Sequence, residues 1–195
     1  MQYIITDFGG VLLRTCSGDL AVNAGALPRR LEAAYLHAGR ELKAIILTGE
    51  HVNRSDGAAS FAEHQGVPLI ASLLVASRCR NLTMGSRRPV TFLVPASLEI
   101  AGARLDFHRL WYDSLDPLYL TVEAENRRIG IVPDGRLDAE TVRPLLECDT
   151  VLLGNRLDLP QNSPGALARR LRSVSNTEAE LDELFRGYRG ELVIR

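Results

Sequence analysis

The feature that most constrains the fold is the apolar run from Leu42 to Thr48. A strand with so few polar positions is expected to be buried on both faces, as in sheets that are covered by further layers. A polar loop follows, and an amphipathic segment over Ala58–Gln65 is expected to form a short helix that ends at Gly66. The order strand, loop, helix is typical of α/β proteins, whose loops at strand ends often carry the functional residues.

Helices and strands alternate at both ends of the chain, with a run of strands between them. Further strands are expected at Tyr3–Asp7, Val11–Thr15, Val67–Ser72, Thr91–Val94, Ser97–Ala101, Arg104–Leu110, Leu118–Glu123, Arg127–Val132, Thr150–Leu153 and Glu191–Ile194. Helices are expected at Ala24–Ala38, from Asp138 as N-cap to Glu147, at Asn162–Leu171, and at Thr177–Arg186 with Asn176 or Thr177 as cap. Turn signals at Gly9-Gly10 and Glu125-Asn126 join neighbouring strands, and Arg78–Pro89 is expected to be a loop. This order predicts an α/β protein with layers around mixed sheets.

The size and composition fit a globular protein. The chain has 195 residues, of which 46% are hydrophobic and 24% are charged, and its net charge is −1. A chain of this length suits one domain, or at most two small ones, and we predict one domain over residues 1–195. The small net charge gives no global sign of nucleic-acid or membrane binding. We interpret the basic runs Arg78–Arg88 and Arg169–Arg172 as solvated faces.

Cysteine usage predicts a reducing compartment. The three cysteines, Cys16, Cys79 and Cys148, are far apart and odd in number, which fits neither a disulfide framework nor a paired metal motif. Cys16 and Cys148 are expected to lie in apolar surroundings as small core residues. The sequence has no signal-peptide pattern and no apolar run of membrane-spanning length, so the predicted location is cytoplasmic.

The polar loop resembles the metal-binding loop of metallo-β-lactamase-fold hydrolases, T-H-x-H-x-D-H-x-x-G, because residues 48–57 read T-G-E-H-V-N-R-S-D-G. Further pieces resemble, in the same order, the phosphodiesterase and nuclease branch related to ribonuclease Z. They are Leu12–Ser17 for L-L-I-D-x-G, Gly66–Leu69 for G-x-P-hydrophobic, Tyr112–Pro117 for H-D-x-x-D-P, Pro133–Gly135 for T-D-x-G, Asn155-Arg156 for Asn-His, and Arg172–Asn176 for G-H-L-S-N. The resemblance implies a four-layer αββα sandwich of two mixed sheets flanked by helices.

The same resemblance assigns the positions of an active site. Family members hydrolyse esters with one or two zinc-class ions that activate a bound water. The first metal would be held at Gly49, His51, Tyr112 and Asp134, and the second at Asn53, Arg54 and Asp134. Glycine has no ligand atom, arginine cannot coordinate a cation, and a catalytic zinc typically needs three protein ligands. We therefore predict a vestigial site without a working metal centre, in which His51 and Asp134 are weak metal candidates, and to which the resemblance adds Asp113, Asn155, Arg156 and Ser173.

Several of these residues allow more than one interpretation. We hypothesise that the Arg54 guanidinium replaces the charge of the metal and pairs with Asp134, which can instead be an ordinary turn aspartate before Gly135. His51 can be a hydrogen-bonding loop histidine. Asp113 and Asp116 could act as paired carboxylates in acid–base chemistry, but a turn at Pro117 explains them better. The remaining histidines, His37, His64 and His108, are interpreted as structural or surface residues.

These features predict a metallo-β-lactamase-fold homologue that is a non-catalytic binding or scaffolding protein without a cofactor, acting with a protein partner or as a homo-oligomer. One alternative is a residual metal-dependent hydrolase, a phosphodiesterase or nuclease, that holds one weakly bound zinc or manganese ion through His51, Asp134 and Asp113, or with ligands from a partner subunit. The other is a sensor of a small anionic ligand, which Arg54 and Arg156 would bind. The sequence has no G-x-S-x-G, P-loop or G-x-G-x-x-G pattern that would indicate another enzyme class.

Overall fold

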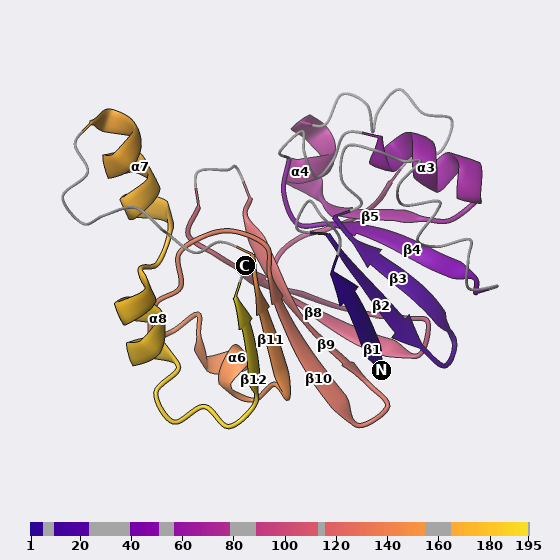
Figure 1. Ribbon diagram of the computed structural model, residues 1–195. Coiled ribbons are helices and arrows are strands. Elements are labelled where there is room, and N and C mark those ends of the chain that lie inside the picture. The colour runs from indigo at the N-terminus through magenta and orange to yellow at the C-terminus, as the bar shows by residue number, and fades with distance from the viewer. Residues whose placement is uncertain are drawn as a thin grey trace.

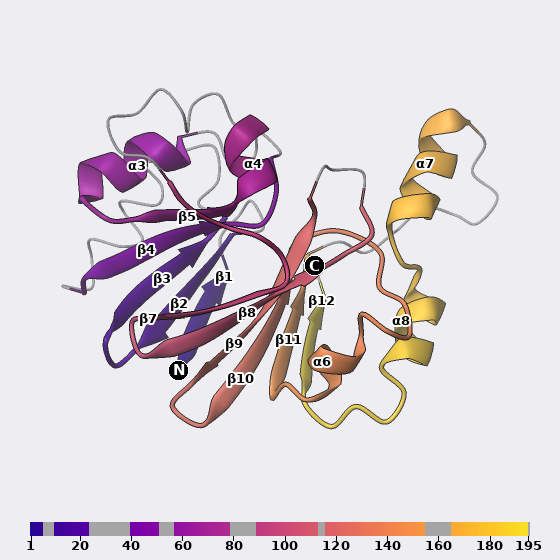
Figure 2. The ribbon, with the colours of Figure 1, turned by 180° about the vertical axis from the view of Figure 1, so that it is seen from behind.

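The strands form two sheets that pack face to face (Figures 1 and 2). The computed structural model describes residues 1–5, 10–23, 40–50, 57–78, 89–112, 116–154 and 165–194. Within these ranges each sheet has six strands, and helices cover the outer face of both sheets. The predicted α/β sandwich of two mixed sheets flanked by helices is therefore confirmed.

The first sheet comes from the N-terminal half of the chain. Its strands, in spatial order, are β1 (Gln2–Ile5), β2 (Val11–Thr15), β3 (Gly18–Val22), β4 (Leu42–Leu47), β5 (Leu69–Ser72) and β6 (Val90–Phe92). The strands β1 to β3 are antiparallel, and β3 to β6 are parallel. The carboxyl ends of β3 to β6 therefore lie at one edge of the sheet.

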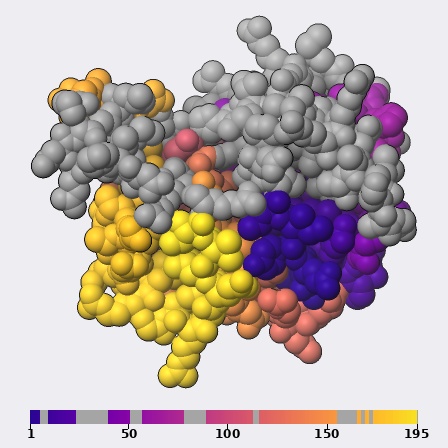
Figure 3. Space-filling model, viewed as in Figure 1, coloured from indigo at the N-terminus to yellow at the C-terminus, as the bar shows by residue number. Residues whose placement is uncertain are grey.

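The second sheet follows in sequence. Its strands, in spatial order, are β7 (Ala96–Ile100), β8 (Ala103–Arg109), β9 (Leu118–Ala124), β10 (Arg127–Val132), β11 (Thr150–Leu153) and β12 (Glu191–Ile194). The strands β7 to β10 are antiparallel, and β10 to β12 are parallel. The Tyr3 hydroxyl lies 3.3 Å from a Glu191 carboxylate oxygen, so β1 and β12 are neighbours, as the adjoining indigo and yellow surfaces in Figure 3 show.

Helices form the outer layers. The helices α3 (Ala58–Gln65) and α4 (Leu73–Arg78) pack on the first sheet, and α6 (Arg143–Leu146) and α8 (Glu178–Leu184) pack on the second. The remaining described helix, α7 (Ala166–Val174), stands away from the sandwich (Figures 1 and 2). No helix in the described ranges is both long and apolar enough to cross a membrane.

Strand β4 shows why the fold needs layers on both sides. Its residues Ala44 and Ile46 belong to the apolar cluster between the two sheets, whereas Ile45 and Leu47 belong to the cluster under α3 and α4. All four side chains are fully buried. Burial of both faces explains the near-continuous apolar run, as predicted, because each face meets a different apolar layer.

Most of the predicted elements are present, with small shifts at their ends. The helix Ala58–Gln65 and the strands Val11–Thr15, Arg127–Val132, Thr150–Leu153 and Glu191–Ile194 have the predicted bounds. The turn at Glu125-Asn126 is confirmed, and its left-handed φ values of 54° and 57° are typical of a tight hairpin. The predicted helix Ala24–Ala38 and the loop over residues 79–88 lie outside the described residues.

One helix prediction and one loop prediction were wrong in extent. Between Asp138 and Glu147 only Arg143–Leu146 is helical, since Pro144 is tolerated only in the first turn and the helix must begin near it. Asp138 instead caps a turn, with its Oδ1 accepting hydrogen bonds from the backbone N–H groups of Glu140 at 3.0 Å and Thr141 at 2.8 Å. Arg78, predicted to begin a loop, ends α4.

The prediction of buried cysteines holds for one of the two described. Cys148 is buried under α6, and this burial raises the pKa of its thiol to about 12, so the thiol stays protonated at neutral pH. Cys16 is exposed, because it lies in the tight turn between β2 and β3 rather than in a strand. The next residue of the turn, Ser17, is exposed as well, whereas Thr15 at the end of β2 is buried.

Strand β3 was not predicted, because it begins with Gly18-Asp19 and so carries a charge in a short segment. The tertiary structure neutralises that charge. The Asp19 side chain is only 2% exposed, and the guanidinium Nε atoms of Arg40 and Arg14 lie 2.7 and 3.6 Å from its carboxylate. A buried carboxylate is tolerated when it is paired in this way.

Asn23 directly follows β3, and its side chain fixes the end of β4. Asn23 Nδ2 donates a hydrogen bond to Thr48 Oγ1 at 2.8 Å, and Asn23 Oδ1 accepts one from Thr48 N at 3.0 Å. Both side chains are buried. Asn23 has a left-handed φ of 54°, which asparagine tolerates better than most residues.

We predict that Asn23→Ala lowers the free energy of unfolding by about 2 kcal/mol, because the buried Thr48 N–H would lose its acceptor. Denaturant unfolding of the variant and the natural chain measures this difference. Asn23→Asp serves as the matched control. The protonated carboxyl of this variant has both a donor and an acceptor, as the amide does, so at a pH where it is protonated this variant should lose less unfolding free energy than Asn23→Ala. Equal stability of the natural chain and Asn23→Ala would contradict the role of this pair.

Helix α8 begins with a capping box. Thr177 Oγ1 accepts a hydrogen bond from Glu180 N, and the Glu180 carboxylate accepts one from Thr177 N. We predict that Thr177→Ala lowers the free energy of unfolding by about 1 kcal/mol. Thr177→Ser keeps the hydroxyl and serves as the matched control, with little loss expected in the same denaturant titration.

Candidate functional site

Loops from both sheets meet at one edge of the sandwich. Leu118 N, at the start of β9, donates a hydrogen bond to Thr48 O at 3.1 Å, and Thr48 directly follows β4. This bond joins the two sheets. Leu110 N donates to Pro117 O at 3.0 Å and closes the loop between β8 and β9. The edge is thus held by main-chain hydrogen bonds between described residues of both sheets.

Three of the predicted site residues lie at this edge. Gly49 directly follows Thr48 and is buried, whereas Tyr112 and Asp134 are half-buried. Arg136 N donates to Trp111 O at 2.7 Å, so the segments that contain Tyr112 and Asp134 run side by side. The structure therefore brings the Gly49, Tyr112 and Asp134 segments together.

The structure places Ser173 elsewhere. It lies on α7 with an exposed side chain, and its hydroxyl donates to Arg170 O at 2.7 Å within the same helix. The other predicted site residues lie outside the described residues, and so does the predicted Arg54–Asp134 pair; these residues are His51, Asn53, Arg54, Asp113, Asn155 and Arg156.

One correspondence with the family pattern needs correction. The segment Leu12–Ser17 was matched to the family's opening strand pattern, but Thr15 pairs with Gly18 and donates a hydrogen bond to Ala101 O at 2.7 Å, away from Thr48. The strand that reaches Thr48 is β3, through Asn23. Residues 20–25 read L-A-V-N-A-G, which matches L-L-I-D-x-G with Asn23 in place of the aspartate. This spacing was the signal in the sequence that could have identified Asn23.

Two glycines allow the chain to pass closely around Asp134. Gly154 N donates to Val132 O at 2.8 Å, and a Cβ atom on Gly154 would overlap the Pro133 carbonyl. Gly135 has a left-handed φ of 120°, and a Cβ atom there would overlap Leu110. Only residues without a side chain fit this close approach. Asp134 thus projects from a loop whose path is set by close packing on both sides.

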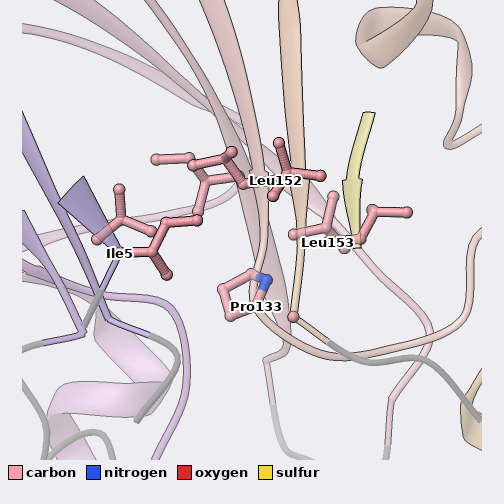
Figure 4. Close-up of a pocket in the computed structure, with 9 residues that line it drawn as sticks. Ile5, Pro133, Leu152 and Leu153 are labelled. Carbon is pink, nitrogen blue, oxygen red and sulfur yellow. The ribbon is translucent and has the colours of Figure 1, made fainter. Parts of the chain in front are cut away.

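An apolar cavity lies between the sheets beside this edge (Figure 4). Ile5, from the first sheet, faces Leu152 of β11 across it, and Leu153 and Pro133 also line it. None of the described side chains that line it is polar; they belong to Ile5, Val11, Ile131, Val132, Pro133, Leu152, Leu153, Gly154 and Val193. These described side chains offer no hydrogen bond to a polar ligand.

The loop after Asp134 is anchored to α8. The Asn176 side chain is buried, accepts a hydrogen bond from Leu137 N at 2.7 Å and donates one to Leu137 O at 3.0 Å. Arg136 Nη2 donates to the Glu180 carboxylate at 2.5 Å. Burial by itself would raise the pKa of Glu180, but hydrogen bonds from Thr177 N and Arg136 outweigh it and hold the pKa below its usual value. The carboxylate is therefore charged at neutral pH and holds Arg136.

The donor atoms at the edge do not make a metal site in the described residues. Gly49 has no side chain, Tyr112 offers a phenol oxygen, and Asp134 offers a carboxylate. No group of three His, Cys, Asp or Glu side chains able to hold a metal occurs in the described part of the chain. These residues alone do not supply the three nitrogen, sulfur or carboxylate ligands that a catalytic zinc typically needs.

No family model and no curated protein sequence matches the chain. Several solved structures, in contrast, match the chain in fold. YhfI from Bacillus subtilis, a metallo-β-lactamase fold protein, matches with a TM-score of 0.66 and 13% identity over 95% of this chain and 88% of that one. Zinc-bound PqqB from Methylobacterium extorquens matches with a TM-score of 0.63 and 16% identity over 74% of this chain, and the match spans only 58% of PqqB. The metallo-β-lactamase MIM-1 from Novosphingobium pentaromativorans matches with a TM-score of 0.55 and 14% identity over 74% of this chain and 69% of that one. The chain therefore has the metallo-β-lactamase fold.

Proposed function

We propose that this chain is a non-catalytic binding or scaffolding protein built on the metallo-β-lactamase fold. The observation that carries the proposal is the chemistry at the site edge. Of the four positions that the family resemblance assigns to the first metal, three are described, and they hold Gly49, Tyr112 and Asp134. One carboxylate and one phenol are a poor set for a tightly bound zinc.

The sequence of the loop supports the same proposal. Asn53 and Arg54 occupy the positions of the second metal in the family pattern, and a guanidinium cannot coordinate a cation. We propose that Arg54 pairs with Asp134 and replaces the positive charge that a metal would provide. A carboxylate held in a packed loop is stabilised by such a partner.

The edge has the properties of a binding surface. Trp111 is 68% exposed although it lies on a segment fixed by the hydrogen bond to Arg136 N. Exposed aromatic side chains on a rigid backbone are typical anchors in protein interfaces. A rigid rim with an exposed aromatic residue favours recognition over chemistry at this edge.

We predict that protein purified without chelator contains far less than one zinc, manganese or iron ion per chain. Excess chelator should leave its melting temperature unchanged, because no ion would contribute to folding stability. Elemental analysis and thermal melting measure the two quantities. Stoichiometric metal, or a melting temperature that falls with chelator, would overturn the proposal in favour of a metal enzyme.

A variant that regains imidazoles provides the positive control. We predict that Gly49→His combined with Tyr112→His binds zinc and melts at a higher temperature with zinc than without it, because both positions lie at the edge that holds Asp134. Adding Asp134→Asn to this variant should abolish the effect, and calorimetric titration with zinc measures the affinity of each.

The alternative function, a residual metal-dependent hydrolase, can be tested directly. We expect that the natural chain and Asp134→Asn hydrolyse bis(p-nitrophenyl) phosphate at the same background rate with excess manganese or zinc. Turnover that depends on the metal and is lost in Asp134→Asn would identify a residual hydrolase that uses this carboxylate.

A further inference from the structure

Four large apolar side chains are exposed at the site edge. They belong to Leu73 and Leu74, at the start of α4, and to Leu93 and Trp111, and each is between 46% and 72% exposed. Large apolar side chains are more often buried, and a group of them at the surface commonly marks an interaction site. These four residues, here called the apolar rim, are therefore candidates for contact with a partner.

The rim residues leave the sandwich from neighbouring segments. Strands β5 and β6 are parallel and paired at their last residues, and Leu73 and Leu93 directly follow them. The guanidinium of Arg109, the last residue of β8, donates a hydrogen bond to Val94 O at 3.4 Å. Trp111 lies two residues beyond Arg109 in the chain. The rim residues therefore lie at the edge where β5, β6 and β8 end.

The backbone under the rim is held by ordered elements. Trp111 forms a β-bridge with Arg136, and its carbonyl accepts the hydrogen bond from Arg136 N. Val75 N donates a hydrogen bond to the buried Ser72 Oγ at 3.2 Å, which fixes the start of α4. A surface that is already ordered loses less entropy on binding than a flexible one.

The segments that carry the rim are basic. Residues 73–78, 90–95 and 109–112 contain two arginines, Arg78 and Arg109, and no acidic residue. The Arg109 side chain is exposed. In the sequence, the chain that joins α4 to β6 adds Arg80, Arg87 and Arg88, again without an acidic residue. The rim therefore calls for a partner that combines apolar side chains with negative charge.

We infer that the apolar rim binds an acidic segment of a partner protein, whose apolar side chains pack on Leu73, Leu93 and Trp111 and whose carboxylates face Arg109. Aromatic residues and arginine are typical of the side chains that contribute most to protein interfaces. The inference rests on the proposed function, which it deepens by naming the chemistry of the partner.

Other occupants fit the rim less well. A second copy of the chain would bring the same basic segments together across a two-fold axis, where like charges repel. A membrane surface is usually bound through longer amphipathic helices, many of which have about 20–30 residues. Helix α4 has only six.

The test uses the fluorescence of Trp111, which is the only tryptophan of the chain. The probe is a short amphipathic peptide made of leucine and glutamate, added to the full chain. Binding should bury the indole and shift its emission to shorter wavelength, and high salt should weaken the binding. Peptides in which lysine replaces glutamate, or serine replaces leucine, should not bind, and they separate the charge from the apolar contact.

Variants of exposed residues locate the contact. Leu93→Ser and Arg109→Glu should each raise the Kd of the peptide about tenfold. Leu146→Ser on α6 and Arg189→Glu before β12 change the same kinds of exposed residue elsewhere, and they should leave the Kd unchanged. Circular dichroism and thermal melting verify that all four variants are folded.

Three results would overturn the inference. The peptide of leucine and glutamate could fail to bind, the lysine peptide could bind equally well, or the two folded rim variants could keep the natural Kd. Vesicles of phosphatidylserine and phosphatidylcholine that shift the emission when the peptide does not would instead assign the rim to a membrane surface.

The inference and the proposed function can fail separately. A metal-free chain that does not bind the peptide would refute the inference alone. A chain that binds the peptide and also holds stoichiometric metal would refute the proposed function alone.

Discussion

The junction between Asn23, Thr48 and Leu118 is the constraint on which the site edge depends. Asn23 forms hydrogen bonds with the side chain and with the backbone N–H of Thr48. Thr48 O in turn accepts a hydrogen bond from Leu118 N in the opposite sheet. Every group in this chain of hydrogen bonds is at the end of a buried strand, where an unpaired polar group is costly. The two sheets are therefore aligned by polar contacts at this edge and by apolar packing over the rest of their faces.

The packing around this edge is set by contacts within the chain itself. Gly154 and Gly135 are required by close backbone packing around Pro133 and Leu110, and Asn176 is required by the backbone of Leu137. Each of these roles serves the packing of the chain itself. Gly49 and Tyr112 occupy two of the positions at which the family resemblance expects metal ligands.

The hydrogen-bond partners differ between the two ends of the region from Ser173 to Glu180. Asn176, Thr177 and Glu180 are held by hydrogen bonds to the loop after Asp134 and within the capping box. Ser173, three residues before Asn176, bonds only within α7. The anchor therefore connects the site edge to the base of α7.

The amino-acid sequence by itself determined the layered α/β architecture, because the apolar run Leu42–Thr48 can be satisfied only by burial on both faces. Helix Ala58–Gln65 and its stop at Gly66 were likewise predicted from local signals, since a left-handed glycine ends a helix in most surroundings. The order of the family motifs predicted the superfamily's fold, and the residues at the ligand positions, such as Gly49 and Tyr112, could be read directly. Strand β3, the exposed turn at Cys16 and the position of Ser173 were decided only by the tertiary structure. The buried Asp19 carboxylate is stabilised by the guanidinium groups of Arg14 and Arg40. Asn23 can form its hydrogen bond with Thr48 only when β4 lies beside β3. Partners that come from distant parts of the chain set these features, and no local pattern contains them.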